Sequence, residues 1–286
     1  MNYKELISTR RSVREYKKGA IKASHISELT GYLEHAKRLI KDISLELQIL
    51  DSDAGEKLSG KAGYNGFMIE APNYMLLLSD KGPNYIKNAG YVGEELVLKA
   101  NDLGIGTCWV TFDNSDLAKE ALNVQSDKEI VALIAMGYPD EKTKAMNVPK
   151  VGENESKTGI YRAKKEVSER MSVEEIVYMN TWGNSATVDD LDQRALLDAF
   201  HYARLAPSTM NRQPWRFILD DHVVVLAVRD DELTDSYEEN IDAGVVMLYF
   251  EAIVDTTLTD ITWTLDKPQK DYKKPSEYVV VGYCTI

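Results

Sequence analysis

The chain has 286 residues, of which 44% are hydrophobic and 28% are charged, as is typical of a globular protein. This composition excludes disordered, collagen-like and solenoid proteins, and the length predicts one or two domains. The formal net charge of −12 at pH 7 argues against nucleic acid or an anionic membrane as a partner. It does not exclude a small phosphorylated ligand, which needs only a local cluster of cations.

The N-terminal segment is charged throughout, and no apolar run approaches the ~18 residues of a membrane-spanning helix. We therefore expect a cytoplasmic protein without a signal peptide. The only cysteines, Cys108 and Cys284, lie far apart in strand-like segments, so we interpret both as reduced, packed residues.

The first half of the chain is predicted to alternate helices and strands. Gly104 and Gly106 end its longest helix, and Pro72 and Asp80 bound its first strand. In chain order, we expect helices over 2–10 and 24–50, a strand over 73–79, a helix over 86–103, a strand over 107–112, a helix over 115–122 and a strand over 130–136.

A polar, lysine-rich stretch over 140–170 separates the two halves. It predicts a first lobe over 1–155, a connection over 156–170 and a second lobe over 171–286. In the second lobe we expect helices over 172–180 and 189–204, a strand over 217–228 broken by AspAspHis, and a helix opened by AspAlaGly at 242–244.

Several markers of the first half recur in the second. Gly90 and Trp109 are 19 positions apart (109 − 90), as are Gly244 and Trp263 (263 − 244). Each half also closes on an apolar strand and GlyTyr. An internal duplication explains this pattern economically, although coincidence stays open because few other residues match.

The two halves keep different special segments. The first has ArgArgSerValArg at 10–14, and the second has AlaProSerThrMetAsnArgGlnProTrp at 206–215. Complementary parts in a duplicated fold suggest one composite site at the interface between the halves.

Four segments, RRSVREY, APSTMNRQPW, AGYVGEELVLKANDLGIGTCW and a strand closing in GYP, together resemble the FMN-dependent nitroreductase family. Members of that family are usually homodimers that hold two flavins between subunits. The resemblance implies an α+β fold of two tandem nitroreductase-like lobes, each with a mixed β-sheet and packed helices, that form a pseudo-dimer within one chain. We expect such a chain to be a monomer that acts on a small-molecule electron acceptor.

Three arginines and a serine lie within one pentapeptide after the first predicted helix. Arginine binds phosphate oxygens in bidentate fashion, so this cluster suits the phosphate and ribityl chain of FMN, with a solvated basic turn as the alternative. By the resemblance, Arg10, Ser12 and Arg14 match flavin contacts, and Arg11 matches less closely. Lys150 falls where the family places a late basic phosphate ligand.

The loop after residue 205 combines rigid prolines with short polar side chains. A purely structural loop would explain the prolines and the tryptophan, but not the neighbouring polar residues. The resemblance implies that Pro207, Ser208, Thr209 and Asn211 line the flavin, whereas Gln213, Pro214 and Trp215 lock the loop.

The segment after GlyIleGly matches the family stretch that lies along the flavin ring. By position, Trp109 and Thr111 contact the flavin there, although Trp109 is equally consistent with a core residue.

No Ser-His-Asp arrangement and no metal-ligand spacing is convincing, so we name no catalytic side chain and expect the flavin to carry the chemistry. The expected activity is FMN-dependent, NAD(P)H-driven reduction of nitroaromatics, quinones or a similar flat acceptor. A non-catalytic flavin carrier or sensor and a flavin-free pseudoenzyme stay open. We expect one flavin per chain, because residues 176–186 offer no cation and residues 40–50 read as helix rather than a polar loop.

Overall fold

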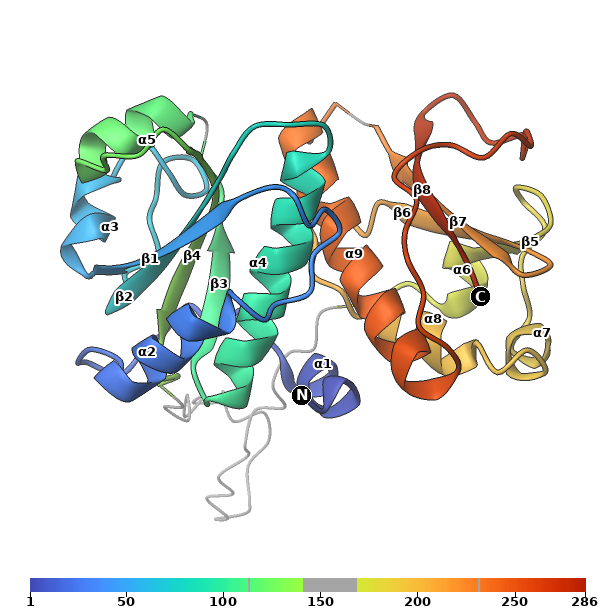
Figure 1. The fold of residues 1–286 in the computed structure, drawn as a ribbon, viewed down its shortest axis with the longest axis horizontal. Coiled ribbons are helices and arrows are strands. Elements are labelled where there is room, and N and C mark those ends of the chain that lie inside the picture. The colour runs from blue at the N-terminus through green and yellow to red at the C-terminus, as the bar shows by residue number, and fades with distance from the viewer. Residues whose placement is uncertain (113, 141–168, 231) are drawn as a thin grey trace, which may run out of the picture.

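Two long helices, α4 (Tyr85–Asp102) and α9 (Ser236–Thr257), lie side by side between two β-sheets (Figure 1). The computed structural model describes residues 1–112, 114–140, 169–230 and 232–286. The α+β fold with two lobes that pack together is confirmed. Lys150 and most of the predicted connection at 156–170 lie outside the described residues.

The first lobe holds a four-stranded antiparallel sheet in the order β1-β2-β4-β3. Ser12 extends its β3 edge through a parallel bridge to Thr107. The strands are β1 (Leu45–Asp51), β2 (Asn73–Ser79), β3 (Gly106–Val110) and β4 (Glu129–Gly137), and the short helices are α1 (Tyr3–Thr9), α2 (Ala23–Tyr32), α3 (Asp53–Lys57) and α5 (Ser115–Leu122).

The second lobe holds a mixed sheet in the order β5-β6-β7-β8, in which only the β5–β6 pair is parallel. Its strands are β5 (Val177–Met179), β6 (Trp215–Asp220), β7 (Val223–Arg229) and β8 (Tyr278–Thr285). Its short helices are α6 (Val173–Ile176), α7 (Val188–Asp192), α8 (Leu197–Ala203) and the 3-10 turn η1 (Thr209–Asn211).

Most predicted elements of the first lobe are confirmed to within a few residues, but the helix over 24–50 is wrong. Helix α2 ends at Tyr32, and Leu45–Asp51 forms the edge strand β1. The reason is that Leu45, Leu47 and Ile49 alternate with polar residues and pair along the fully buried β2. Residues 33–44 are therefore a loop and turns rather than part of a helix.

Two helices predicted in the second lobe are also shorter than expected. The helix over 172–180 stops at Ile176, because Val177–Met179 pairs in parallel with β6. The helix over 189–204 is split between α7 and α8, where Ala195 takes a left-handed φ of 56°.

Helix α9 begins earlier than the sequence predicted. AspAlaGly at 242–244 lies within the helix rather than at its start, because the helix already begins at Ser236. The Asp235 side chain caps it there by accepting from the Glu238 N–H at 2.9 Å.

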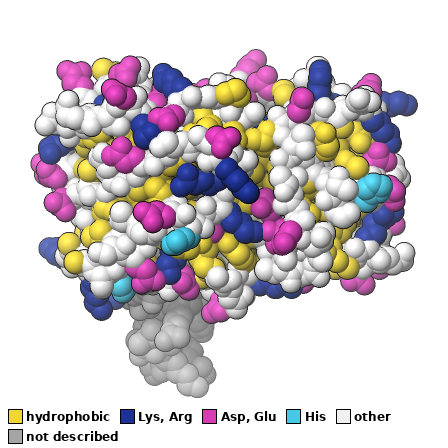
Figure 2. All heavy atoms as spheres, viewed as in Figure 1, with side chains coloured by type: hydrophobic (Ala, Val, Ile, Leu, Met, Phe, Trp, Pro, Cys, Tyr) yellow, Lys and Arg dark blue, Asp and Glu magenta, His cyan; other side chains and the backbone are white. Residues whose placement is uncertain are grey.

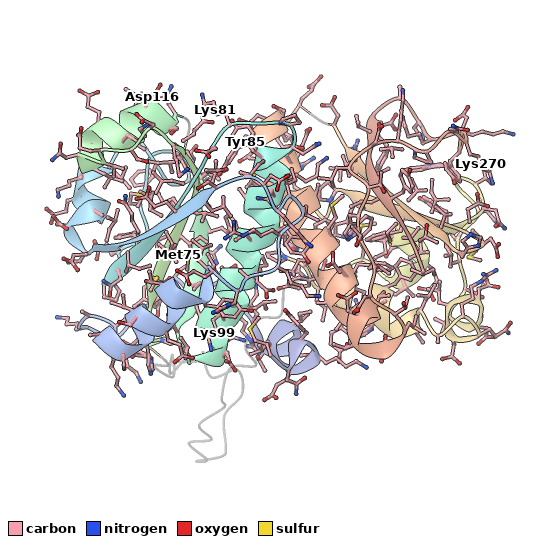
Figure 3. The ribbon with its side chains drawn as sticks, in the orientation of Figure 1. Met75, Lys81, Tyr85, Lys99, Asp116 and Lys270 are labelled. Carbon is pink, nitrogen blue, oxygen red and sulfur yellow. The ribbon has the colours of Figure 1, made fainter. Side chains whose placement is uncertain are left out.

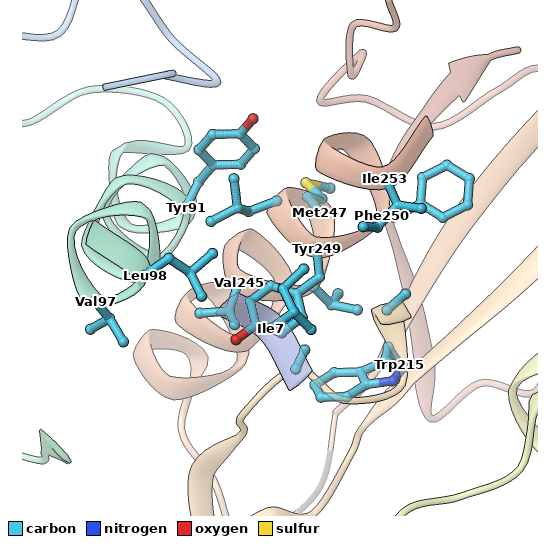
Figure 4. Packing of buried hydrophobic residues seen from close by; sticks show 14 of the residues in the cluster. Ile7, Tyr91, Val97, Leu98, Trp215, Val245, Met247, Tyr249, Phe250 and Ile253 are labelled. Atoms are coloured by element: carbon cyan, nitrogen blue, oxygen red, sulfur yellow. The ribbon is translucent and has the colours of Figure 1, made fainter. Parts of the chain in front are cut away.

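The contact between α4 and α9 forms the centre of the core. Figure 4 shows Tyr91 and Leu98 of α4 facing Val245 and Tyr249 of α9. The two helices are also related by a constant spacing in sequence of 154 positions (244 − 90, 242 − 88 and 263 − 109). It joins Gly90 to Gly244 and Asn88 to Asp242 within the helices. It also joins Trp109 of β3 to Trp263, which follows α9.

Shorter contacts tie the outer helices to this centre. Lys99, near the end of α4 in Figure 3, donates to Glu28 of α2 at 2.6 Å. Helix α1 packs on helices of both lobes, and its Lys4 pairs with Asp198 of α8. Acidic and basic side chains are interspersed over the face seen in Figure 2. Within the described ranges, no helix is long and apolar enough to cross a membrane.

Candidate functional site

A cavity of about 820 Å³ lies between the lobes. Its walls combine apolar faces with hydroxyl groups, and one of its lining residues is an arginine. Volumes of this size are typical of cofactor and small-molecule sites. Of the residues predicted from the sequence, the cavity brings together Ser12, Arg14, Trp109, Thr111, Pro207, Ser208 and Thr209.

The segment after α1 forms one edge of the cavity. The Val13 N–H donates to the Thr107 carbonyl oxygen at 2.8 Å, so this segment runs along β3. Ser12 and Arg14 flank that bond and line the cavity, both largely exposed to solvent. Arg11 is exposed and does not line the cavity.

Arg10 points elsewhere, into a buried polar network. Its Nε donates to Glu94 Oε1 at 2.9 Å, and the two side chains are 6% and 0% exposed. The same carboxylate accepts from Trp109 Nε1 and from the Tyr249 hydroxyl, each at 2.8 Å. Glu94 therefore holds the Trp109 ring, which lines the cavity, through a contact that links both lobes.

The loop at 206–214 forms the opposite edge. Met210, Asn211 and Gln213 all take left-handed φ values between 51° and 58°, a conformation that is uncommon for residues with side chains. Asn211 does not line the cavity, because its side chain accepts from Arg170 and donates to the Glu169 carbonyl oxygen.

Gln213 also holds this loop in place, through two hydrogen bonds. Its Oε1 accepts from the Met171 N–H at 2.9 Å, and its own N–H donates to Ser208 Oγ at 2.9 Å. The loop is thus fixed to residues 169–171, while its first half is left to face the cavity.

The rim of the cavity is apolar and was not predicted from the sequence. Phe67 and Tyr64 are 79% and 70% exposed, and Met210 and Leu233 are also exposed. The first two lie on a glycine-rich loop whose Gly63 N–H donates to the Thr111 carbonyl oxygen at 2.7 Å. The signal available in the sequence was two aromatic residues beside the closely spaced Gly60, Gly63 and Gly66.

Two further residues of the wall were also missed. Asp242 of α9 is buried, and its carboxyl group accepts from the Thr209 N–H. Cys108 is buried as predicted, and burial raises the pKa of its thiol, which disfavours a reactive thiolate. Among the described residues, no group of His, Cys, Asp and Glu side chains could hold a metal ion.

The donor set fits a flavin mononucleotide. A flavin ring is apolar on its faces and polar at its edge, which suits Trp109, Val110 and Ile241 beside the hydroxyl groups of the wall. The guanidinium of Arg14 suits a phosphate at the open edge. These residues could hold FMN, with Ser12, Thr111, Ser208 and Thr209 as hydroxyl donors.

A family profile and a solved structure that match this chain are both described as putative nitroreductases. A family profile described as "Putative TM nitroreductase" matches residues 2–254. A solved structure described as a putative nitroreductase from Thermotoga maritima is 17% identical, with a TM-score of 0.59, and the match covers 100% of this chain and 94% of that one. At this identity the likeness concerns the fold. A comparison with curated proteins finds no match.

Shorter solved proteins match about half of the chain. An FMN-dependent nitroreductase from Clostridium difficile is 24% identical, covering 52% of this chain and 98% of that one, with a TM-score of 0.42. A protein from Clostridium acetobutylicum described as "Putative NADH Oxidase" is 24% identical, covering 48% of this chain and 89% of that one, with a TM-score of 0.41. TM-scores this low add nothing to the fold assignment.

Proposed function

The chain belongs to the nitroreductase family described as "Putative TM nitroreductase", and on that premise we propose that it is an FMN-dependent NAD(P)H oxidoreductase. Family membership makes it an oxidoreductase. The proposal adds FMN as the cofactor, a nicotinamide as the electron donor, and nitroaromatics, quinones or a similar flat molecule as the acceptor.

The cavity between the lobes is the observation that carries this proposal. Segments from three distant parts of the chain meet there, around residues 12–14, 109–111 and 207–209. Each segment contains residues that the family resemblance assigns to flavin contacts. Their convergence on one cavity of cofactor size supports a single composite flavin site.

Each wall has a distinct task in this proposal. Arg14 binds the phosphate, and the hydroxyl groups of Ser208 and Thr209 bind polar atoms of the ribityl chain or ring edge. Trp109, held by Glu94, fixes the position of one apolar wall. Bound FMN would supply the hydride chemistry, accepting from a nicotinamide and passing electrons to the acceptor.

The apolar rim supports a flat acceptor. Phe67 and Tyr64 stand at the cavity mouth with most of their surface exposed, where they can pack against a second ring. We also propose that the chain acts as a monomer derived from an internal duplication, because both edges of the cavity come from one polypeptide.

An absorbance experiment tests the function. The protein is reconstituted with FMN, freed of excess flavin, and mixed anaerobically with NADH or NADPH. Bleaching of bound flavin, followed by reoxidation with a quinone or nitroaromatic, is the expected result. Bound flavin that ignores both nicotinamides would instead indicate a carrier or sensor, and failure to bind FMN would indicate a pseudoenzyme.

A further inference from the structure

Asp242 is a buried carboxyl group in the wall of the cavity. It lies on α9 and is 3% exposed. Both of its oxygens face the Thr209 N–H, at 3.1 and 3.2 Å, and Thr209 belongs to the loop that lines the same cavity. Asp242 therefore contacts both the loop and the space that a ligand would fill.

The first lobe contains a neutral counterpart. Asn88 occupies the matching position on α4, 154 positions earlier (242 − 88), and its Oδ1 accepts from the Ile40 N–H at 3.0 Å. Asn88 is also buried, but it does not line the large cavity. An amide is thus sufficient to hold a loop at this position, so fastening the loop does not by itself require a carboxyl group.

The surroundings of Asp242 disfavour a negative charge. An ionised carboxylate has about four acceptor sites. The Asp242 carboxyl group accepts from one backbone N–H, that of Thr209, and no described cation forms an ion pair with it. Burial is the largest effect and raises the pKa of Asp242 well above its usual range. Glu238 and Glu239 on α9 raise it further, while the Thr209 N–H and Arg212 of the loop act in the opposite direction.

We propose that Asp242 acts as a neutral carboxylic acid that donates a hydrogen bond to an acceptor atom of the cavity's ligand. One oxygen accepts from the Thr209 N–H, and the protonated oxygen donates into the cavity. The ligand class is a ring with carbonyl or imine acceptors at its edge, a description that FMN meets. This inference rests on the proposed function.

Infrared difference spectroscopy tests the proposal directly. ¹³C-labelled FMN is added to unlabelled protein at pH 7, so that the flavin carbonyl bands move to lower frequency, away from the C=O band of a protonated carboxyl. We expect the C=O band of a protonated carboxyl to shift on FMN binding, to respond to exchange into D₂O, and to be missing in Asp242→Asn. FMN binding without such a band would overturn the inference alone, whereas no FMN binding by the wild type would overturn the proposed function and the inference with it.

Affinity gives a second measurement with matched variants. Asn resembles a neutral carboxylic acid, because it can accept from Thr209 and donate into the cavity, so Asp242→Asn should bind FMN within about threefold of wild type at pH 7. Asp242→Leu should bind FMN at least about tenfold more weakly than wild type. Asn88→Leu, which removes the equivalent loop contact in the first lobe, should leave the affinity unchanged. Equal losses in Asp242→Asn and Asp242→Leu would contradict the proposal.

Discussion

Gly90 of α4 and Gly244 of α9 make reciprocal close contacts where the two helices cross. A Cβ atom on Gly90 would lie 2.3 Å from the Ile241 carbonyl oxygen, and one on Gly244 would lie 2.0 Å from the Lys87 carbonyl oxygen. Both obstacles are backbone atoms, which cannot rotate away. The lobes therefore pack as closely as they do because neither helix carries a side chain at its crossing point.

Gly244→Ala should separate the two helices and destabilise the protein by about 2 kcal/mol or more, because the clash outweighs the gain in helix propensity. Denaturant unfolding measures this loss. Gly31→Ala in α2 is the matched control, since an added Cβ there meets nothing within 4 Å and should be neutral or stabilising by up to about 1 kcal/mol. Equal stability of the two variants would refute the close crossing.

Arg10 and Arg14 should respond differently to substitution, although the sequence predicted the same role for both. Arg10→Ala leaves Glu94 buried without its ion-pair partner, so we expect a loss of about 3–5 kcal/mol in unfolding free energy. Arg14→Ala removes an exposed side chain at the cavity, so stability should change by less than about 0.5 kcal/mol while FMN binds roughly tenfold to a hundredfold more weakly.

Riboflavin, which lacks the phosphate, provides the control for Arg14. If Arg14 binds the phosphate, Arg14→Ala should weaken FMN binding but leave riboflavin binding nearly unchanged. A similar loss for both ligands would place Arg14 at the ring or ribityl chain instead.

The sequence predicts well the elements that depend on local signals. Strand β2 has an apolar centre and follows Pro72, and α4 ends just before Gly104, so both lie close to their predicted bounds. Strands β1 and β5 were missed because each is defined by pairing with a distant strand. Helical spacing in the residues before β1 also masked its alternation.

In the candidate site, too, residues marked by local sequence were predicted, whereas contacts between distant residues were not. Residues of unusual type, such as Pro207 and Ser208, were found because a loop that combines prolines with small polar residues is distinctive. The partnership of Arg10 with Glu94 was not foreseen, because it joins residues 84 positions apart across packed helices. Asp242 was read only as part of a repeated helix marker, since a carboxylate on a helix normally faces solvent.

Lys87 should make the free energy of unfolding depend on pH in the alkaline range. Burial lowers the pKa of this lysine from 10.5 to about 8, while its Nζ donates to the Val281 carbonyl oxygen at 2.9 Å. Between about pH 8 and 10.5 the unfolded chain binds this proton and the folded chain does not, so the unfolding free energy should rise with pH there.

Lys87→Met should lack that rise, which amounts to at most about 3 kcal/mol. The stability of the variant relative to wild type should therefore be greatest near pH 7 and decline towards pH 10.5. Denaturant unfolding at pH 7, 8.5 and 10 measures this trend. Lys267→Met is the control and should follow the wild-type curve, because Lys267 is exposed although it lines, together with Lys87, a second cavity of about 300 Å³.

The final prediction is one flavin per chain. The counterpart of the large cavity has a volume of about 300 Å³ and is lined by Asn84, Lys87 and Leu265, which match Glu238, Ile241 and Thr111 at the same spacing of 154 positions (238 − 84, 241 − 87 and 265 − 111). Residues 40–50 form a loop and strand β1, so the helix predicted there, on which the expectation of one flavin partly rested, is wrong.

The smaller volume and the side chain of Lys87 still favour a single site. Lys87 is buried where the large cavity has Ile241, and residues 176–186 supply no cation for a phosphate. Lys87 Nζ already donates to the Val281 carbonyl oxygen, and no arginine among the described residues lines this pocket. Hydrogen bonds to a charged group contribute roughly 1.5–3 kcal/mol each, so losing several arginine–phosphate contacts should weaken FMN binding there by several powers of ten. Reconstitution, denaturation and quantitation of the released flavin should give a ratio near one, and Arg14→Ala should lower it at limiting FMN. A ratio near two would show that the smaller cavity opens to accept a second flavin.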